Sequence, residues 1–121
     1  MIDLPFIQEF SDLLTVDWKP LIPALLNKAV PVAQRAMQFH LSLAKSIAAQ
    51  AQRVRASVPF DRVGLTGGVF QNRLLAELAL ARLAAAGFEA CLPERAPCND
   101  GGIALGQLVE AARAAEGSGR G

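Results

Sequence analysis

Cysteine and histidine are scarce in this chain of 121 residues, which contains Cys91, Cys98 and the single histidine His40. Two cysteines are too few to build the disulfide framework of a small secreted domain. Their long spacing, without further ligands, also excludes the usual structural zinc pattern. No basic and apolar leader opens the sequence, so we expect a cytoplasmic protein in a reducing environment.

Long apolar runs and an excess of charge of one sign are also missing. No run approaches the roughly 18 apolar residues of a membrane span, and 12 basic against 11 acidic side chains leave a net charge of +1. We therefore expect neither a membrane nor a nucleic acid as a partner. The hydrophobic fraction of 52% and the mean hydropathy of +0.29 are high. Such a chain has a dense core or a face that packs against another surface, and a homodimer would provide one.

The first half of the chain is expected to be mainly helical. A short strand is predicted within Leu13–Asp17, and Asp17 is placed to cap a following helix that Pro23 breaks or kinks. A long amphipathic helix is predicted from Pro31 to the sequence VPFD, because proline suits a first helical turn. Its apolar positions recur every three to four residues, at Ala33, Met37, Ala44, Ile47, Ala51 and Val54.

The second half alternates strands with helices. Strands are predicted at Arg62–Thr66 and in FEACLP, and helices over Gln71–Gly87, with Gly87 as the C-terminal cap, and in IALGQLVEAARAAE. This order predicts a parallel βαβ unit within a helix-rich α/β fold whose small sheet is mostly parallel. We expect one lobe over residues 1–116 and a flexible tail over residues 117–121, either a frayed terminus or a remnant of expression.

Two glycine turns follow the two strands and are the candidate site. Gly67-Gly68 opens a helix, whose N-terminal N–H groups suit a phosphate, and Asn72 offers a donor and an acceptor to a ribose or base. A tight strand-to-helix turn would explain the same glycines. In the second turn, Asp100 precedes Gly101-Gly102, and it either caps the last helix or binds a metal. Because ligands collect at the carboxyl ends of parallel strands, we expect both turns to lie close together.

For His40 and Cys98 the sequence favours a structural role over a catalytic one. His40 shares a helical face with Met37, Ala44 and Ile47, which favours a packed, hydrogen-bonded histidine over a catalytic one. Cys98 lies at a helix start that would stabilise a thiolate. No second histidine is present to activate it, so a packed cysteine is favoured over a nucleophile.

The motifs LTGGVFQNRLL and PCNDGGIALGQ, preceded by DWKPLIPAL and FHLSLAKSIA, together resemble the C-terminal part of HypF-type hydrogenase maturation carbamoyltransferases. The resemblance covers about Asp17 to Val109 and implies half of an actin-like ATPase (ASKHA) domain. It also implies a carbamoyl group that passes from carbamoyl-adenylate, made from carbamoyl phosphate and ATP, to the C-terminal cysteine of HypE. The product becomes a cyanide ligand of NiFe hydrogenase. The implied nucleotide-binding residues are Gly67, Gly68, Asn72, Gly101 and Gly102, and Asp100 is the implied ligand of a divalent metal.

The chain also departs from that family's pattern. It lacks the HxxxH histidine pair that supplies the other metal ligands, and Cys98 stands where proline is more usual. The other domains and the first half of the actin-like domain are absent too. We therefore expect a natural or excised fragment that has no transferase activity alone and needs the remaining lobe of its parent enzyme. The alternatives are a non-catalytic lobe for docking or dimerisation, and part of an O-carbamoyltransferase.

Overall fold

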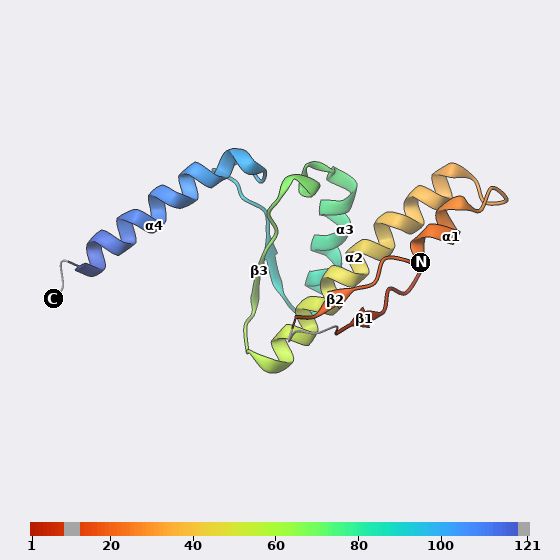
Figure 1. The fold of residues 1–121 in the computed structure, drawn as a ribbon, viewed down its shortest axis with the longest axis horizontal. Helices are drawn as coiled ribbons and strands as arrows, with labels where there is room; N and C mark the ends of the chain where they lie inside the picture. The colour runs from red at the N-terminus through yellow and green to blue at the C-terminus, as the bar shows by residue number, and fades with distance from the viewer. Residues whose placement is uncertain (9–12, 119–121) are drawn as a thin grey trace.

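The structure, a computed structural model, describes residues 1–8 and 13–118. Its body is built on two packed helices, α2 (Val32–Ser57) and α3 (Arg73–Ala85), which lie side by side in Figure 1. The strands β3 (Arg62–Gly64) and β4 (Glu89–Cys91) form a parallel pair joined through α3. This is the predicted βαβ unit, and the last helix, α4 (Ile103–Ser118), extends away from it (Figure 1).

A second strand pair lies near the N-terminus. β1 (Phe6–Ile7) pairs antiparallel with β2 (Thr15–Val16), with Phe6 opposite Val16. β2 confirms the strand predicted there, whereas β1 was not expected, because two residues are too few to show a period. Among the described residues the two pairs form separate sheets. The expectation of a mostly parallel sheet is therefore correct for β3 and β4 alone.

The first helix begins later than expected and has a different cap. α1 spans Leu21–Leu26, and Pro20 occupies its N-cap position. Asp17 Oδ1 instead accepts a hydrogen bond from the backbone N–H of Lys19 at 3.0 Å, which makes a local turn before the helix. Pro23 is the third residue of α1 and does not break it, because N–H groups in the first turn have no intrahelical acceptor to lose.

The long helix begins as predicted, with Pro31 at its N-cap, but its buried face is shorter than the apolar stripe. Met37 and Val54, both in the predicted stripe, are 43% and 46% exposed. Burial is confined to the middle of α2, at Ser42, Ala44, Ser46 and Ala48. These small side chains allow the close approach of α3.

The hydrophobic core lies where α2 and α3 meet the β3–β4 pair. Ala44 of α2 and Ala79 and Leu83 of α3 are completely buried, and Leu65 and Phe88 contribute from positions beside the two strands. Gly87 ends α3 as predicted, with a positive φ of 81° that suits glycine. The core therefore holds in place the two strands that precede the glycine turns.

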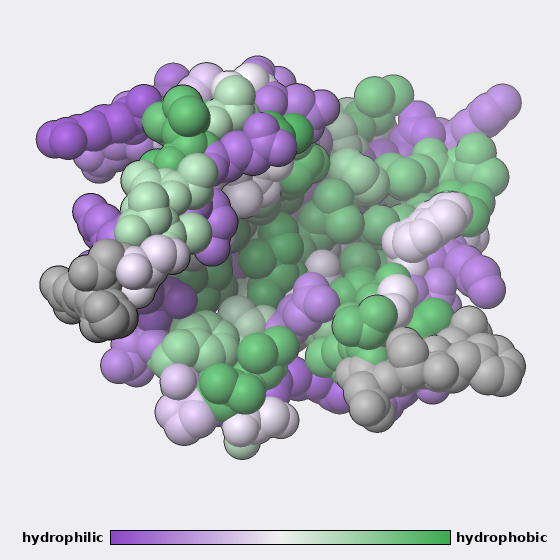
Figure 2. Space-filling model, turned by 60° about the vertical axis from the view of Figure 1, so that its left-hand side comes forward, coloured by the Kyte–Doolittle hydropathy of each residue, from purple (hydrophilic) through white to green (hydrophobic). Residues whose placement is uncertain are grey.

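The last helix has no buried residue. Its apolar side chains remain in contact with solvent, among them Ile103, Leu105, Leu108 and Val109. Figure 2 shows a broad hydrophobic area in a hollow of the face that turns toward the viewer. The large apolar fraction of the chain thus includes an uncovered surface as well as a core, which fits a lobe that packs against another structure.

Two residues assigned to the tail belong to the last helix. Gly117 and Ser118 are its final residues, because α4 runs to Ser118. The rest of the predicted tail, residues 119–121, lies outside the described residues. Of the helices in the described part of the chain, none is long and apolar enough to cross a membrane.

Candidate functional site

The two glycine turns meet, as the sequence predicts. The backbone N–H of Gly67, in the first turn, donates a hydrogen bond to the carbonyl oxygen of Cys98, just before the second, at 2.5 Å. The parallel register of β3 and β4 makes this contact possible, because both strands end on the same side. Leu65 N–H also donates to Cys91 O at 2.9 Å, which continues the pairing toward the turns. Cys98 contributes its backbone carbonyl here, and its thiol is free.

The first turn requires a glycine at one position and leaves space at the next. Gly67 has a φ of 110°, a conformation that a side chain would strain. At Gly68 the backbone is ordinary, and a Cβ would come no nearer than 4.0 Å to Gln71 Oε1. A turn of helix, Gly68–Gln71, leads into α3. Packing against the described residues therefore does not explain the missing side chain at Gly68.

The second turn is capped by Asn99 and not by Asp100, for which the sequence left a cap and a metal ligand as alternatives. Asn99 Oδ1 accepts a hydrogen bond from the backbone N–H of Gly101 at 3.0 Å and so caps the turn Asp100–Gly102. A Cβ at Gly102 would lie 2.6 Å from the carbonyl oxygen of Pro97. The fold of the loop itself therefore explains the glycine at position 102.

Asp100 is exposed and is not the cap. Its carboxylate makes no hydrogen bond or ion pair with the described residues, so its lone pairs are available to a ligand. It also lies in the first turn before α4, where a negative charge is favourable. Asp100 is therefore not the cap of this turn, because the side chain of Asn99 occupies that role.

Asn72 lies at the start of α3, and both the oxygen and the nitrogen of its side-chain amide already have one hydrogen-bond partner. Its Oδ1 accepts a hydrogen bond from the backbone N–H of Leu75 at 3.1 Å, which makes it the N-cap of α3. Its Nδ2 lies 2.8 Å from Nε2 of His40 on α2. An amide has one further N–H and one further lone pair, so Asn72 retains one donor and one acceptor for a ligand.

The next residue adds a positive charge to this helix start. Arg73 Nε lies 2.7 Å from Glu77 Oε1, and this exposed pair spans one turn of α3. The hydrogen bond and the charge of Glu77 raise the pKa of Arg73. The guanidinium is therefore cationic at all accessible pH values, and it lies beside the N-cap of a helix whose dipole also attracts anions.

A metal would need more ligands than this part of the chain brings together. Within residues 1–8 and 13–118, no three His, Cys, Asp or Glu side chains gather around a common point. Divalent cations of the magnesium type require several oxygen ligands. Asp100 alone does not satisfy that requirement, so further ligands would have to come from outside the described residues.

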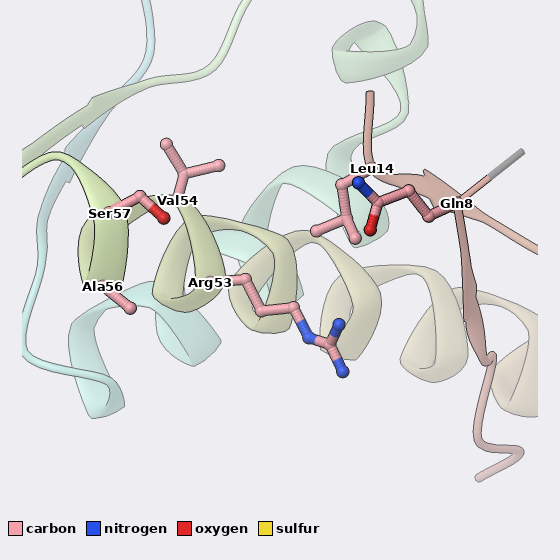
Figure 3. Close-up of a pocket in the computed structure, with 6 residues that line it drawn as sticks. All are labelled: Gln8, Leu14, Arg53, Val54, Ala56 and Ser57. Atoms are coloured by element: carbon pink, nitrogen blue, oxygen red, sulfur yellow. The ribbon is translucent and has the colours of Figure 1, made fainter. Parts of the chain in front are cut away.

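A pocket near the N-terminal strands is remote from the glycine turns. Its volume is about 410 Å³, and Figure 3 shows that residues of α2 form one wall while Gln8 and Leu14 approach from the strand region. The guanidinium of Arg53 stacks 4.6 Å from the centre of the Phe6 ring. This arrangement ties the N-terminal segment to α2, and it places no group near the turns.

Replacement of Asn72 by alanine is expected to destabilise the protein by about 1 kcal/mol, the usual cost of losing a polar N-cap. Replacement by serine keeps a capping oxygen, so Asn72→Ser should cost much less in the same measurement. Urea unfolding followed by circular dichroism gives both values. Equal losses of stability in the two variants would contradict the capping role.

Comparison with known proteins places the chain in a family. Residues 3–107 match the family model described as the second subdomain of the Kae1-like domain of carbamoyltransferase HypF. Carbamoyltransferase HypF of Rhizobium leguminosarum bv. viciae is 43% identical over 94 residues, which cover 77% of this chain and 12% of that protein. The HypF of a Synechocystis strain is 38% identical over 97 residues, which cover 79% of this chain and 12% of the relative.

A solved structure agrees with these sequence relatives. A full-length HypF in its phosphate- and nucleotide-bound form superposes with a TM-score of 0.84 and 29% identity, covering 97% of this chain and 16% of that one. The chain therefore belongs to the carbamoyltransferase HypF family and corresponds to the second subdomain of its Kae1-like domain. It spans about an eighth of the length of the two relatives. These matches confirm the family resemblance seen in the two glycine motifs.

Proposed function

We propose that this chain supplies one wall of the nucleotide site of a HypF-type carbamoyltransferase. The observation that supports this most directly is the hydrogen bond from Gly67 N–H to Cys98 O, which brings both glycine turns together. Around that contact lie two helix starts, the uncovered backbone of Gly68 and the unpaired carboxylate of Asp100. Helix N-termini and bare glycine backbone are the features that bind phosphate groups.

In this proposal each residue has a limited task. The phosphates of ATP or carbamoyl-adenylate are approached by the backbone at Gly67, Gly68, Gly101 and Gly102. The free N–H and the free lone pair of the Asn72 amide bind the nucleoside. Asp100 provides one ligand to a divalent cation whose other ligands lie elsewhere in the enzyme. Bound carbamoyl-adenylate presents its carbamoyl carbon to the thiolate of the C-terminal cysteine of HypE. As the C–S bond forms, the bond between the carbamoyl carbon and the phosphate oxygen of AMP breaks, and AMP leaves.

The uncovered surface of α4 belongs in the same proposal. Leu108 is 69% exposed and Ile103 58%, in a chain that corresponds to one subdomain of a larger protein. We infer that the remaining part of the HypF-type enzyme covers this helix. A second copy of the chain could bury the same side chains when the rest of the enzyme is missing, which would make a homodimer the state of the isolated lobe.

The proposal is tested by adding the missing parts of the enzyme. The chain alone, incubated with HypE, carbamoyl phosphate and ATP, is expected to give no carbamoylated HypE in mass spectrometry, because one wall does not complete the site. A chimera in which residues 3–107 replace the matching segment of the Rhizobium HypF is expected to transfer the carbamoyl group.

The two outcomes separate the candidate functions. Transfer by the isolated chain would show that it is a complete enzyme and would contradict the proposed division of the site. A chimera that folds, judged by its melting temperature, but never transfers the carbamoyl group would favour a docking module that does not take part in catalysis.

A further inference from the structure

The hydrogen bonds of His40 determine which of its ring nitrogens carries the proton. Nδ1 lies 2.7 Å from the carbonyl oxygen of Ala36, one turn earlier in α2. A carbonyl oxygen only accepts hydrogen bonds, so Nδ1 must carry the hydrogen. In the neutral ring Nε2 is then an acceptor, and it lies 2.8 Å from Nδ2 of Asn72.

The same reasoning determines the orientation of the Asn72 amide. Its oxygen faces a backbone N–H, that of Leu75 at 3.1 Å, and its nitrogen faces the acceptor Nε2 of His40. A rotated amide would place its oxygen against Nε2 and its N–H₂ group against the Leu75 N–H, which replaces two hydrogen bonds by two repulsive contacts. Only one combination of histidine tautomer and amide orientation therefore satisfies all four atoms.

We propose that His40 is a positioning residue for the nucleotide site, which acts by accepting a hydrogen bond from Asn72 as the neutral Nδ1–H tautomer. This inference rests on the proposed function, since it assigns the second donor and the second lone pair of Asn72 to the nucleoside. With Oδ1 and Nδ2 each held by one partner, the remaining N–H and lone pair have fixed directions before a ligand arrives. His40 itself touches no ligand in this arrangement.

The surroundings of His40 suit such a role. The ring of Phe39 meets the imidazole edge-on, with centroids 5.5 Å apart and an interplanar angle of 86°. The contact between His40 and Asn72 joins residues 32 positions apart and ties the first half of α2 to the residue just before α3. The half-buried ring is held at both nitrogens, by Ala36 O and by Asn72 Nδ2, so its orientation is defined.

The first test uses the full chain without a ligand. The ¹⁵N chemical shifts of His40 should show a protonated Nδ1 and an unprotonated Nε2, and the side-chain amide of Asn72 should show a hydrogen bond to the ring. His40→Leu, which has a similar size but no acceptor, should abolish that coupling. The opposite tautomer, or an unchanged Asn72 amide in His40→Leu, would overturn the inference whatever the chain binds.

The second test measures ATP affinity by calorimetric titration of the chimera and its variants. His40→Leu should weaken binding about tenfold, the order expected for the loss of one positioned hydrogen bond, and His40→Gln should restore most of it, because the glutamine oxygen can replace Nε2. Gln34→Ala, an exposed change on the same helix, should bind as the parent does. Equal affinity in His40→Leu and the parent chimera would overturn the inference.

The two tests distinguish the failure of this inference from failure of the proposed function. A parent chimera that binds no ATP would contradict the nucleotide site, while the tautomer and the Asn72 contact are still decided by the spectra. A parent that binds ATP, with His40→Gln as weak as His40→Leu, would show that the imidazole acts by packing and not as an acceptor.

Discussion

Replacement of Asp100 by asparagine is expected to reduce carbamoyl transfer by at least about a hundredfold, the order seen when a preorganised electrostatic group is removed from an active site. The carboxylate is exposed and has no partner among the described residues, so in the proposed site its charge acts on the bound cation and phosphates. The melting temperature should change by only a few degrees, because Asn99 and not Asp100 caps the turn. Activity is measured in the chimera by mass spectrometry of HypE.

Two matched variants give this prediction its controls. Glu94→Gln removes the same charge from an exposed residue of the same loop, and it should leave transfer unchanged. Asn99→Ala removes the capping oxygen and should lower the free energy of unfolding by about 1 kcal/mol. If Asp100→Asn keeps full activity, or if Glu94→Gln is equally inactive, the assignment of Asp100 to the nucleotide site is wrong.

Replacement of Leu83 by alanine is expected to lower the free energy of unfolding by about 2–5 kcal/mol, the range for a leucine removed from a packed core. Leu83 has no solvent-accessible surface and lies in the cluster where α3 meets α2 and β4. Its carbonyl oxygen also accepts the N–H of Phe88 at 3.0 Å, at the turn that leads into β4. For a domain whose total stability is about 5–15 kcal/mol, this is a large fraction.

The control for this change is a leucine of the uncovered helix. Leu108 on α4 is 69% exposed in the single chain, so Leu108→Ala should alter the stability of a monomeric chain by less than about 0.5 kcal/mol. Urea unfolding of both variants gives the comparison. A loss below about 1 kcal/mol at Leu83 would mean that the α2–α3 contact is not the core of this lobe, and a large loss at Leu108 would mean that α4 is buried in solution, as in a dimer.

Local sequence signals were sufficient for the βαβ unit. Proline at the start of α2, the glycine after α3 and the short apolar strands each act over a few residues, so their elements could be predicted from the chain alone. The same signals failed for β1, which is two residues long, and for Asp17, whose oxygen makes a local turn before the helix. Within a few residues of a turn, several polar side chains compete for the same N–H groups, and spacing does not decide among them.

The sequence by itself determined that both glycine turns follow parallel strands and so must meet, and its motifs were specific enough to indicate the family. Only the tertiary structure decided which side chains are already occupied there. It assigned the cap to Asn99 and left Asp100 free, and it joined Asn72 to His40 across 32 residues of sequence. The physical reason is range: a strand or a turn is encoded by neighbouring residues, whereas a hydrogen bond between α2 and α3 exists only after their core has packed.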